Sequence, residues 1–143
     1  MRRRDFIRSI ERLAAGALCV GLPPAAMGCS GLAYVPSIRN GNLLIVDRAD
    51  LGAHPFALVE HPEIPRAIYL HRHPDDAYTA VLTRCTHRGC QVEPAGERLA
   101  CPCHGSEYSL TGTVLHGPAE RPLTRYAVTA DADHITIHLP SVP

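Results

Sequence analysis

Apolar residues follow one another in short runs from Asn42 onward, and each run is broken by Gly, Pro, Asp or His. The alternation is clearest near the C-terminus, where Ile135, Ile137 and Leu139 share one face of an extended chain and the polar residues between them share the other. Runs of this kind predict strands at residues 42–47, 56–61, 67–72, 78–84, 126–130 and 134–139. The pattern therefore favours an all-β domain, either a sandwich or stacked antiparallel sheets.

Composition agrees with many short strands. The chain has 143 residues, the size of one domain, with ordinary fractions of charged and hydrophobic residues. Its 13 prolines and 11 glycines interrupt the apolar runs before any of them reaches the length of a typical helix. A cysteine- and histidine-rich segment of about residues 84–120 falls between two strand runs, so we expect it to be inserted near one end of the domain.

The balanced net charge hides an asymmetry along the chain. The first 28 residues carry five arginines against Asp5 and Glu11, so the remainder is mildly acidic. Nothing in that remainder forms the basic stripe that phosphate binding requires, which argues against a nucleic-acid partner. Residues 1–28 are therefore best treated as a targeting segment, residues 29–40 as a linker and residues 41–143 as the folded domain.

The N-terminal sequence "RRRDFIRS" resembles a twin-arginine export signal, with Arg3 and Arg4 followed by a short spacer and an apolar pair. Such a signal predicts export to the periplasmic side of the inner membrane. Residues 13–38 contain no charge and are long enough to span a bilayer, although Pro23 and Pro24 interrupt them. The sequence "AAMGC" ending at Cys29 is similar to a lipoprotein processing box. Lipidation at Cys29, an uncleaved anchor and simple cleavage all stay open.

Candidate chemistry lies in two stretches, "CTHRGC" and "CPCHGSEY". The first offers Cys85 and His87 at loop spacing, and the second offers Cys101 and His104. Each stretch has one cysteine in excess, Cys90 in the first and Cys103 in the second.

By donor type alone, two cysteines and two histidines also fit a tetrahedral zinc site. The spare pair argues against zinc, because Cys90 and Cys103 can form a disulfide between the two loops in an oxidising compartment. A closed structural zinc site already ties its loops together and rarely needs such a brace. A non-redox zinc-binding domain nevertheless stays open as an interpretation of the residues alone.

The double motif, followed by "GTVLHGPAERPL", resembles the Rieske iron–sulfur proteins, specifically the exported, disulfide-containing, high-potential type. The resemblance covers about residues 40–139. It implies stacked antiparallel sheets with a cluster-binding subdomain at about residues 84–120, and it implies a [2Fe–2S] cluster. In such a cluster Cys85 and Cys101 would hold one iron, and His87 and His104 would hold the other.

The same resemblance implies roles for the surrounding residues. Cys90 and Cys103 would form the disulfide, Ser106 would donate a hydrogen bond to a bridging sulfide, and Tyr108 would donate one to a ligand cysteine sulfur. A loop covering the cluster is implied at Gly117, Pro118 and Ala119. The other histidines are expected to be solvated on strand edges or loops, and they include His54, His61, His71 and His73.

Arg88 departs from the family, because Rieske subunits of cytochrome bc complexes usually carry leucine beside the first histidine ligand. This departure favours an electron-transfer subunit or carrier that serves a cytochrome or oxidoreductase partner, with Arg88 at the docking surface and no turnover by the chain alone. A cytochrome bc-type, quinol-oxidising subunit is the alternative. A ring-hydroxylating oxygenase would need a mononuclear iron site and a second domain, for which the chain has no length.

Overall fold

The computed structural model describes residues 32–140, so the export signal and Cys29 lie outside the described residues. The elements are strands apart from one short helix, and in chain order they are β1 Tyr34–Pro36, β2 Ile38–Asn40, β3 Leu43–Asp47, α2 Arg48–Leu51, β4 Phe56–Glu60, β5 Ile68–Arg72, β6 Tyr78–Leu82, β7 Glu93–Ala95, β8 Arg98–Ala100, β9 Glu107–Ser109, β10 Val114–His116, β11 Arg125–Ala130 and β12 His134–His138. Within residues 32–140, no helix has both the length and the apolar character needed to span a bilayer.

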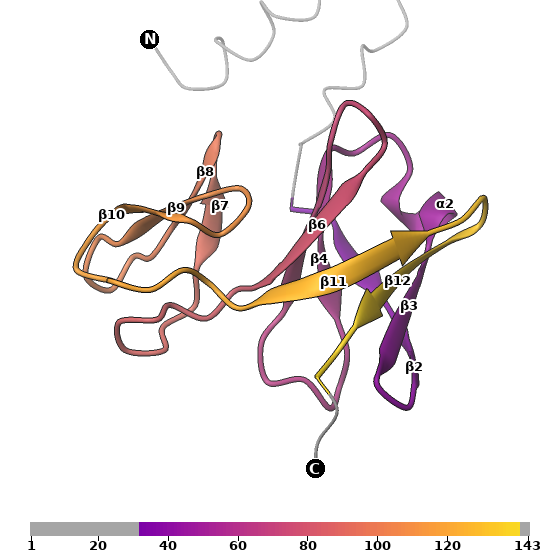
Figure 1. Ribbon diagram of the computed structural model, residues 1–143, viewed down its shortest axis with the longest axis horizontal. Helices are drawn as coiled ribbons and strands as arrows, with labels where there is room; N and C mark the ends of the chain where they lie inside the picture. The colour runs from indigo at the N-terminus through magenta and orange to yellow at the C-terminus, as the bar shows by residue number, and fades with distance from the viewer. Residues whose placement is uncertain (1–31, 141–143) are drawn as a thin grey trace, which may run out of the picture. The chain divides into compact units, whose positions relative to one another are not determined.

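Eight of the strands form one sheet in the order β1-β4-β5-β6-β11-β12-β3-β2. Its two edge strands, β1 and β2, are separated along the chain by Ser37 alone, so the sheet must curl until it nearly closes on itself (Figure 1). The all-β prediction is confirmed, but one pair departs from the antiparallel expectation, because β1 runs parallel to β4. Residues 34–40, predicted to be linker, form β1 and β2 of this sheet.

The interior of the curled sheet follows from the alternation seen in the sequence. Ile135 and Ile137 of β12 are buried opposite Val46 and Leu44 of β3, with which they pair in antiparallel register. Full burial of each such side chain contributes about 1.5–3 kcal/mol to stability. Leu139, the third apolar residue of the predicted face, packs against the same core and is only partly buried.

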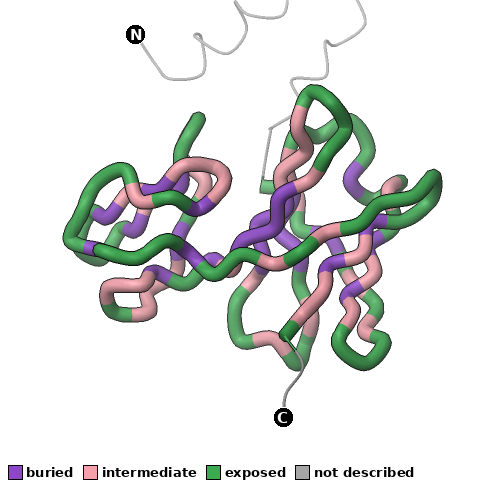
Figure 2. The backbone as a smooth tube through the Cα atoms, viewed as in Figure 1, coloured by how far each residue is buried: buried purple, intermediate pink, exposed green. Residues whose placement is uncertain are grey.

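The second sheet, in the order β10-β9-β8-β7, is the expected insertion, since all four strands lie between β6 and β11 in the chain (Figure 1). It has its own apolar core, which also includes Tyr69 and Val81 from the outer face of the eight-stranded sheet. Gly112 permits this close packing, because a Cβ there would lie 3.0 Å from Val81 Cγ1. Purple segments in both parts of Figure 2 mark the two cores.

On that outer face, the rings of Tyr69, His71 and His73 form a row. His71 was expected to be solvated, and its place in this row differs from that expectation. The His71 ring stacks on Tyr69 at 6.1 Å and meets His73 edge-on at 4.8 Å between ring centroids. His73 Nε2 lies 2.6 Å from Thr79 Oγ1. His71 is half-buried, and its burial, followed by the nearby His73, lowers its pKa. The prediction that His71 is solvated is therefore wrong.

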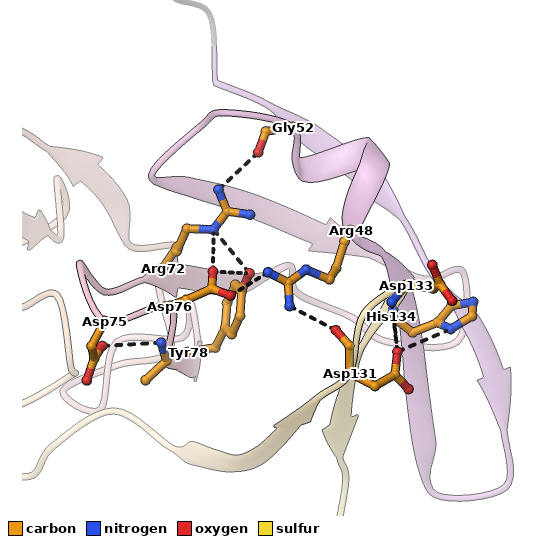
Figure 3. Close-up of polar contacts among 10 residues, drawn as sticks. Arg48, Gly52, Arg72, Asp75, Asp76, Tyr78, Asp131, Asp133 and His134 are labelled. Carbon is orange, nitrogen blue, oxygen red and sulfur yellow. Dashed lines mark hydrogen bonds and ion pairs between the residues drawn. The ribbon is translucent and has the colours of Figure 1, made fainter.

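Away from the second sheet, a polar network joins α2 to the hairpins β5–β6 and β11–β12 (Figure 3). Arg48 donates to the Asp76 carboxylate and, over 2.8 Å, to the carbonyl of Asp131. Asp76 also accepts from Tyr78 Oη at 3.2 Å and lies 3.3 Å from Arg72 Nε. The Arg48 hydrogen bond is the main reason that the pKa of Asp76 lies below its usual range.

Candidate metal centre

The loop between β6 and β7 presents Cys85 and His87. The N–H of Cys85 donates to the carbonyl of Cys90 over 2.8 Å, and the N–H of Gly89 donates back to the carbonyl of Cys85 over 2.8 Å. These two bonds fold residues 86–88 into a tight turn, which needs a residue with positive φ at its end, and Gly89 has φ of +77°. We call residues 85–90 the first loop.

The loop between β8 and β9 repeats this construction at residues 101–106, which we call the second loop. The N–H of Cys101 donates to the carbonyl of Ser106 over 2.8 Å, and the N–H of Gly105 donates to the carbonyl of Cys101 over 3.0 Å. Gly105 has φ of +76°. The backbone of the two loops is therefore equivalent, and each places its first cysteine at the base and its histidine on the turn.

The two loops are joined by a disulfide between Cys90 and Cys103, with a Cα–Cα distance of 6.5 Å. This pairing was predicted and is confirmed. Cys85 and Cys101 remain free thiols and are both buried. The sulfur of Cys101 lies within 4.8 Å of the disulfide sulfurs, but disulfide sulfurs are not thiolates, so Cys101 is the residue of this group that offers a free thiol to a metal.

The imidazoles of His87 and His104 meet edge-on, with ring centroids 4.9 Å apart and an interplanar angle of 87°. His87 Nδ1 is buried and has no hydrogen-bond partner within the described chain. A buried ring nitrogen without a partner is costly unless something else occupies its lone pair. An iron atom of a [2Fe–2S] cluster would do so, and the set of two thiols and two imidazoles has the donor types for one.

Tyr108 of β9 connects the base of the site to the first loop. Its hydroxyl oxygen lies 3.2 Å from Cys85 Sγ and also accepts from the N–H of Thr86 at 3.2 Å. The ring is fully buried, and burial raises the pKa of Tyr108, so its hydroxyl keeps the proton that it can donate to sulfur.

The two free thiols have different surroundings. Burial is the largest influence on Cys85 and raises its pKa. Hydrogen bonds with Tyr108, the backbone of His87 and the side chains of Cys101 and Ser106 together outweigh it and leave the pKa below its usual value. Burial raises the pKa of Cys101. A bound metal ion would convert both thiols to thiolates.

Ser106 is buried at the end of the second loop. Its Oγ accepts a hydrogen bond from the N–H of Ala119 over 3.0 Å, which anchors the predicted cover loop to the site. Since an oxygen that accepts can still donate, the Ser106 proton stays available for a sulfur atom. Gly117 and Pro118 are exposed, as the outer part of such a loop would be.

The sequence profile of the Rieske [2Fe–2S] domain matches residues 42–127, which include both loops, Tyr108 and the cover loop. The chain belongs to the Rieske family. Its Rieske domain carries a [2Fe–2S] cluster as cofactor, and the donor set described above fits that cluster.

Relatives with similar sequences include iron–sulfur subunits of cytochrome b6-f complexes. The subunit from Chlorobaculum thiosulfatiphilum is 44% identical over 63 residues, which are 43% of this chain and 35% of that protein. The subunit from Cyanothece sp. is 30% identical over an alignment that covers 95% of this chain and 83% of that protein. The match thus covers about a third of the Chlorobaculum subunit and most of the Cyanothece one.

Among solved structures, the plasma membrane Rieske protein PetC3 from Synechocystis PCC 6803 is similar to this chain. The two are 34% identical, with a TM-score of 0.55, and the match covers 64% of this chain and 93% of PetC3. A hyperthermophilic respiratory Complex III chain shares the fold at 20% identity and a TM-score of 0.50.

Among the predicted ligands, the structure pairs the thiols of Cys85 and Cys101 and the imidazoles of His87 and His104. It also adds one residue that the sequence analysis did not single out. Thr86 Oγ1 lies 3.2 Å from Tyr108 Oη and donates to the carbonyl of Arg121 over 2.6 Å. Thr86 lies between the predicted ligands Cys85 and His87 in the sequence, and this position could have identified it as part of the site. Arg88 is exposed on the first loop, as a docking residue would need to be.

Proposed function

We propose that this protein transfers single electrons between redox proteins through a [2Fe–2S] cluster held by Cys85, Cys101, His87 and His104. The observation that carries the proposal is that two equivalent loops each supply one buried free thiol and one imidazole, with the two imidazoles in edge-on contact. The cytochrome b6-f subunits with similar sequences are named as iron–sulfur subunits, which supports the same assignment. A bound cluster supplies one-electron chemistry at a potential that its ligands and hydrogen bonds set.

The residues of the chain orient and tune this site. The disulfide holds the two loops at a fixed separation. The ligands are therefore ordered before the metal binds, which lowers the entropy cost of binding. The hydroxyl of Tyr108 lies 3.2 Å from Cys85 Sγ, and that of Ser106, which accepts from the N–H of Ala119, keeps its proton for a sulfur atom. Donation to sulfur would stabilise added negative charge more than it stabilises the oxidised state.

Visible absorption of the purified protein and electron paramagnetic resonance of its reduced form test the proposal. A [2Fe–2S] site gives both signals, whereas a zinc site gives neither, so a colourless protein with stoichiometric zinc would contradict the proposal. We expect His87→Ala and Cys101→Ala to lose both signals and the iron.

Arg88 suggests which kind of partner the site serves. Entry of its guanidinium into an apolar quinol pocket would bury a charge without a counter-charge, which costs several kcal/mol and exceeds the gain from a leucine contact. Docking on a polar protein surface avoids this cost, since Arg88 could there pair with an acidic residue. We therefore favour a cytochrome or an oxidoreductase subunit as the direct partner.

The cytochrome b6-f relatives favour a second candidate, a quinol-oxidising subunit in which Arg88 lies at the rim of the quinol site. Comparison of electron-transfer rates at rising salt separates the two candidates. Protein docking predicts a rate that falls with salt and a changed salt dependence in Arg88→Leu. Inhibitor-sensitive quinol oxidation by the native complex that is unaffected by salt and abolished when this chain is deleted would favour the second candidate.

The N-terminal sequence supports an exported location for this electron transfer. Arg3 and Arg4 resemble the arginine pair of a twin-arginine signal. The export route that such a signal serves carries folded proteins, so the cluster can be inserted before export. We propose that the domain faces the periplasm and is held at the inner membrane by an uncleaved anchor or by a lipid on Cys29. Mass spectrometry of the mature N-terminus distinguishes lipidation, retention and cleavage.

A further inference from the structure

Beside the first loop lies a groove of about 680 Å³. One wall comes from Leu82 and residues 84–89, and the other from Arg121, Pro122 and Thr124. Arg84 and Arg88 line the first wall, Arg121 lines the second, and no Asp or Glu lines either. We call this feature, defined by these three side chains, the arginine groove.

The charges of the arginine groove are not neutralised by the protein. Four other arginines of residues 32–140 form ion pairs with carboxylates, and they are Arg39, Arg48, Arg72 and Arg98. Within the same residues, Arg84, Arg88 and Arg121 form none. Three like charges around one hollow repel one another, so an acidic group that enters the hollow gains attraction from all of them.

The guanidinium donors of the groove are also unused. Among the side-chain hydrogen bonds of the described chain, none comes from the guanidinium of Arg84, Arg88 or Arg121. Arg84 nevertheless lies close along the first loop, since a Cβ on Gly89 would be 3.2 Å from Arg84 Nε. Each guanidinium presents five N–H donors in a planar fork that matches a carboxylate.

The arginine groove lies on one side of the metal centre only. Cys85 and His87 line the groove, whereas Cys101 and His104 do not. Around the second loop, the exposed residues of β10 and the cover loop are uncharged or histidine, and Leu115 is 59% exposed there. A partner attracted by charge would therefore approach the first loop.

We propose that the arginine groove binds carboxylates on the acidic surface of a redox protein and so places that partner beside His87 rather than His104. This inference rests on the proposed electron-transfer function and adds the chemistry and position of the partner. In the encounter one electron leaves the reduced protein and reduces the ferric haem of a cytochrome partner, with no proton or other reactant required.

The test uses the reduced, cluster-loaded protein and two soluble c-type cytochromes of higher midpoint potential, one with an acidic surface and one with a basic surface. Stopped-flow absorption measures the second-order rate of haem reduction at several NaCl concentrations. We expect the rate with the acidic cytochrome to fall as salt rises and the rate with the basic cytochrome not to fall. Arg84→Gln and Arg121→Gln should each lower the low-salt rate with the acidic cytochrome roughly threefold.

Arg66→Gln is the matched control, because Arg66 is exposed, forms no ion pair within residues 32–140 and lies outside the groove. It changes net charge by the same amount and should leave the rate nearly unchanged. Visible absorption verifies that each variant keeps its cluster. An equal loss in Arg66→Gln and in both groove variants would overturn the inference, because net charge alone would then explain the effect.

Hydrogen–deuterium exchange of the mixture with the acidic cytochrome tests the position. We expect protection at residues 84–89 and 121–124, and protection confined to residues 113–118 would overturn the inference.

Stronger inhibition by inorganic phosphate than by NaCl at equal ionic strength would assign the groove to a small anion instead. Co-sedimentation with anionic phospholipid vesicles that the groove variants lose would assign it to a lipid surface. A cluster-loaded protein that reduces neither cytochrome would instead contradict the proposed function itself.

Discussion

At the scale of single residues, the hydroxyls of Tyr108 and Ser106 are the candidate hydrogen-bond donors to cluster sulfur. Tyr108 Oη lies 3.2 Å from Cys85 Sγ, and the same oxygen is fixed by the N–H of Thr86. Ser106 is held by the N–H of Ala119. Because both hydroxyls are buried and held by other groups, they are oriented before any electron arrives, and their main effect should be on potential rather than on cluster binding.

Tyr108→Phe should keep the cluster and lower its midpoint potential. The variant loses one donor to sulfur, and a difference of about 1 kcal/mol between the two redox states corresponds to roughly 40 mV for one electron. Protein-film voltammetry measures the shift. Ser106→Ala should act in the same direction, while Ser109→Ala, whose Oγ accepts from the N–H of Thr113, serves as a hydroxyl control away from sulfur. An unchanged potential in Tyr108→Phe would contradict donation to a cluster sulfur.

At the scale of elements, the metal centre consists of two equivalent loops linked by one covalent bond. Each loop is closed by its own pair of backbone hydrogen bonds, so neither depends on the other for its shape. Their separation depends on the disulfide and on the small sheet β7–β10. The disulfide should therefore matter for assembling and retaining the cluster, although neither of its cysteines offers a free thiol to a metal.

Cys90→Ser and Cys103→Ser should each give protein with less cluster and faster cluster loss. The disulfide spans 13 residues and contributes about 3 kcal/mol by chain entropy, which the loops then lack. The decay of visible absorption in the presence of a chelator measures the loss. A Cys103→Ser protein without any cluster, together with a His104→Ala protein that keeps one, would show that the two roles are assigned the wrong way round.

A second element-scale feature is the network in which Arg48 joins α2 to two hairpins (Figure 3). Asp76 has φ of +61°, a conformation that asparagine also tolerates, so Asp76→Asn removes the charge without straining the turn. The folded-state pKa of Asp76 is lowered, so its contribution to stability is present above its unfolded pKa and is lost as pH falls through the folded value.

Asp76→Asn should therefore lower the urea midpoint at neutral pH, and the difference from the parent should shrink as the pH falls into the acid range. Circular dichroism at several pH values measures both midpoints. Asp75→Asn is the control, since Asp75 forms no ion pair in the described chain and its bond to the N–H of Ala77 can be kept by asparagine. A difference that persists unchanged at low pH would rule out the charge as its cause.

At the scale of the whole molecule, the eight-stranded sheet acts as a base that displays the second sheet and its loops. Both cores are apolar, and Tyr69 and Val81 belong to the second core although their strands lie in the first sheet. This shared packing gives the loops a firm support. The proposed export signal predicts that the cluster is inserted before the protein crosses the membrane.

Replacement of Arg3 and Arg4 by lysine should leave the protein in the cytoplasm, because the twin-arginine route depends on that pair. Fractionation followed by immunodetection measures the distribution. A fusion of this domain to the leader peptide of an unrelated exported protein is the positive control for export. Normal periplasmic levels of the double variant would contradict the twin-arginine assignment.

The local pattern of apolar and polar residues was enough to predict the six longer strands of this protein. All six predicted strands occur, with ends shifted by one or two residues, because alternation of apolar and polar residues depends only on the two faces of a strand. The resemblance of the double motif to Rieske proteins also implied the four candidate ligands and the Cys90–Cys103 pair, and the structure contains that disulfide.

Other features depended on long-range pairing that no local pattern contains. The parallel pairing of β1 with β4, the choice of Cys85 as the sulfur beside Tyr108 and the burial of His71 arise only when distant strands meet. The arginine groove has the same origin, because Arg121 lies far along the chain from the first loop. The sequence thus determined which residues carry the chemistry, and the tertiary structure decided their neighbours, because contacts between segments distant in the chain depend on how the whole sheet closes.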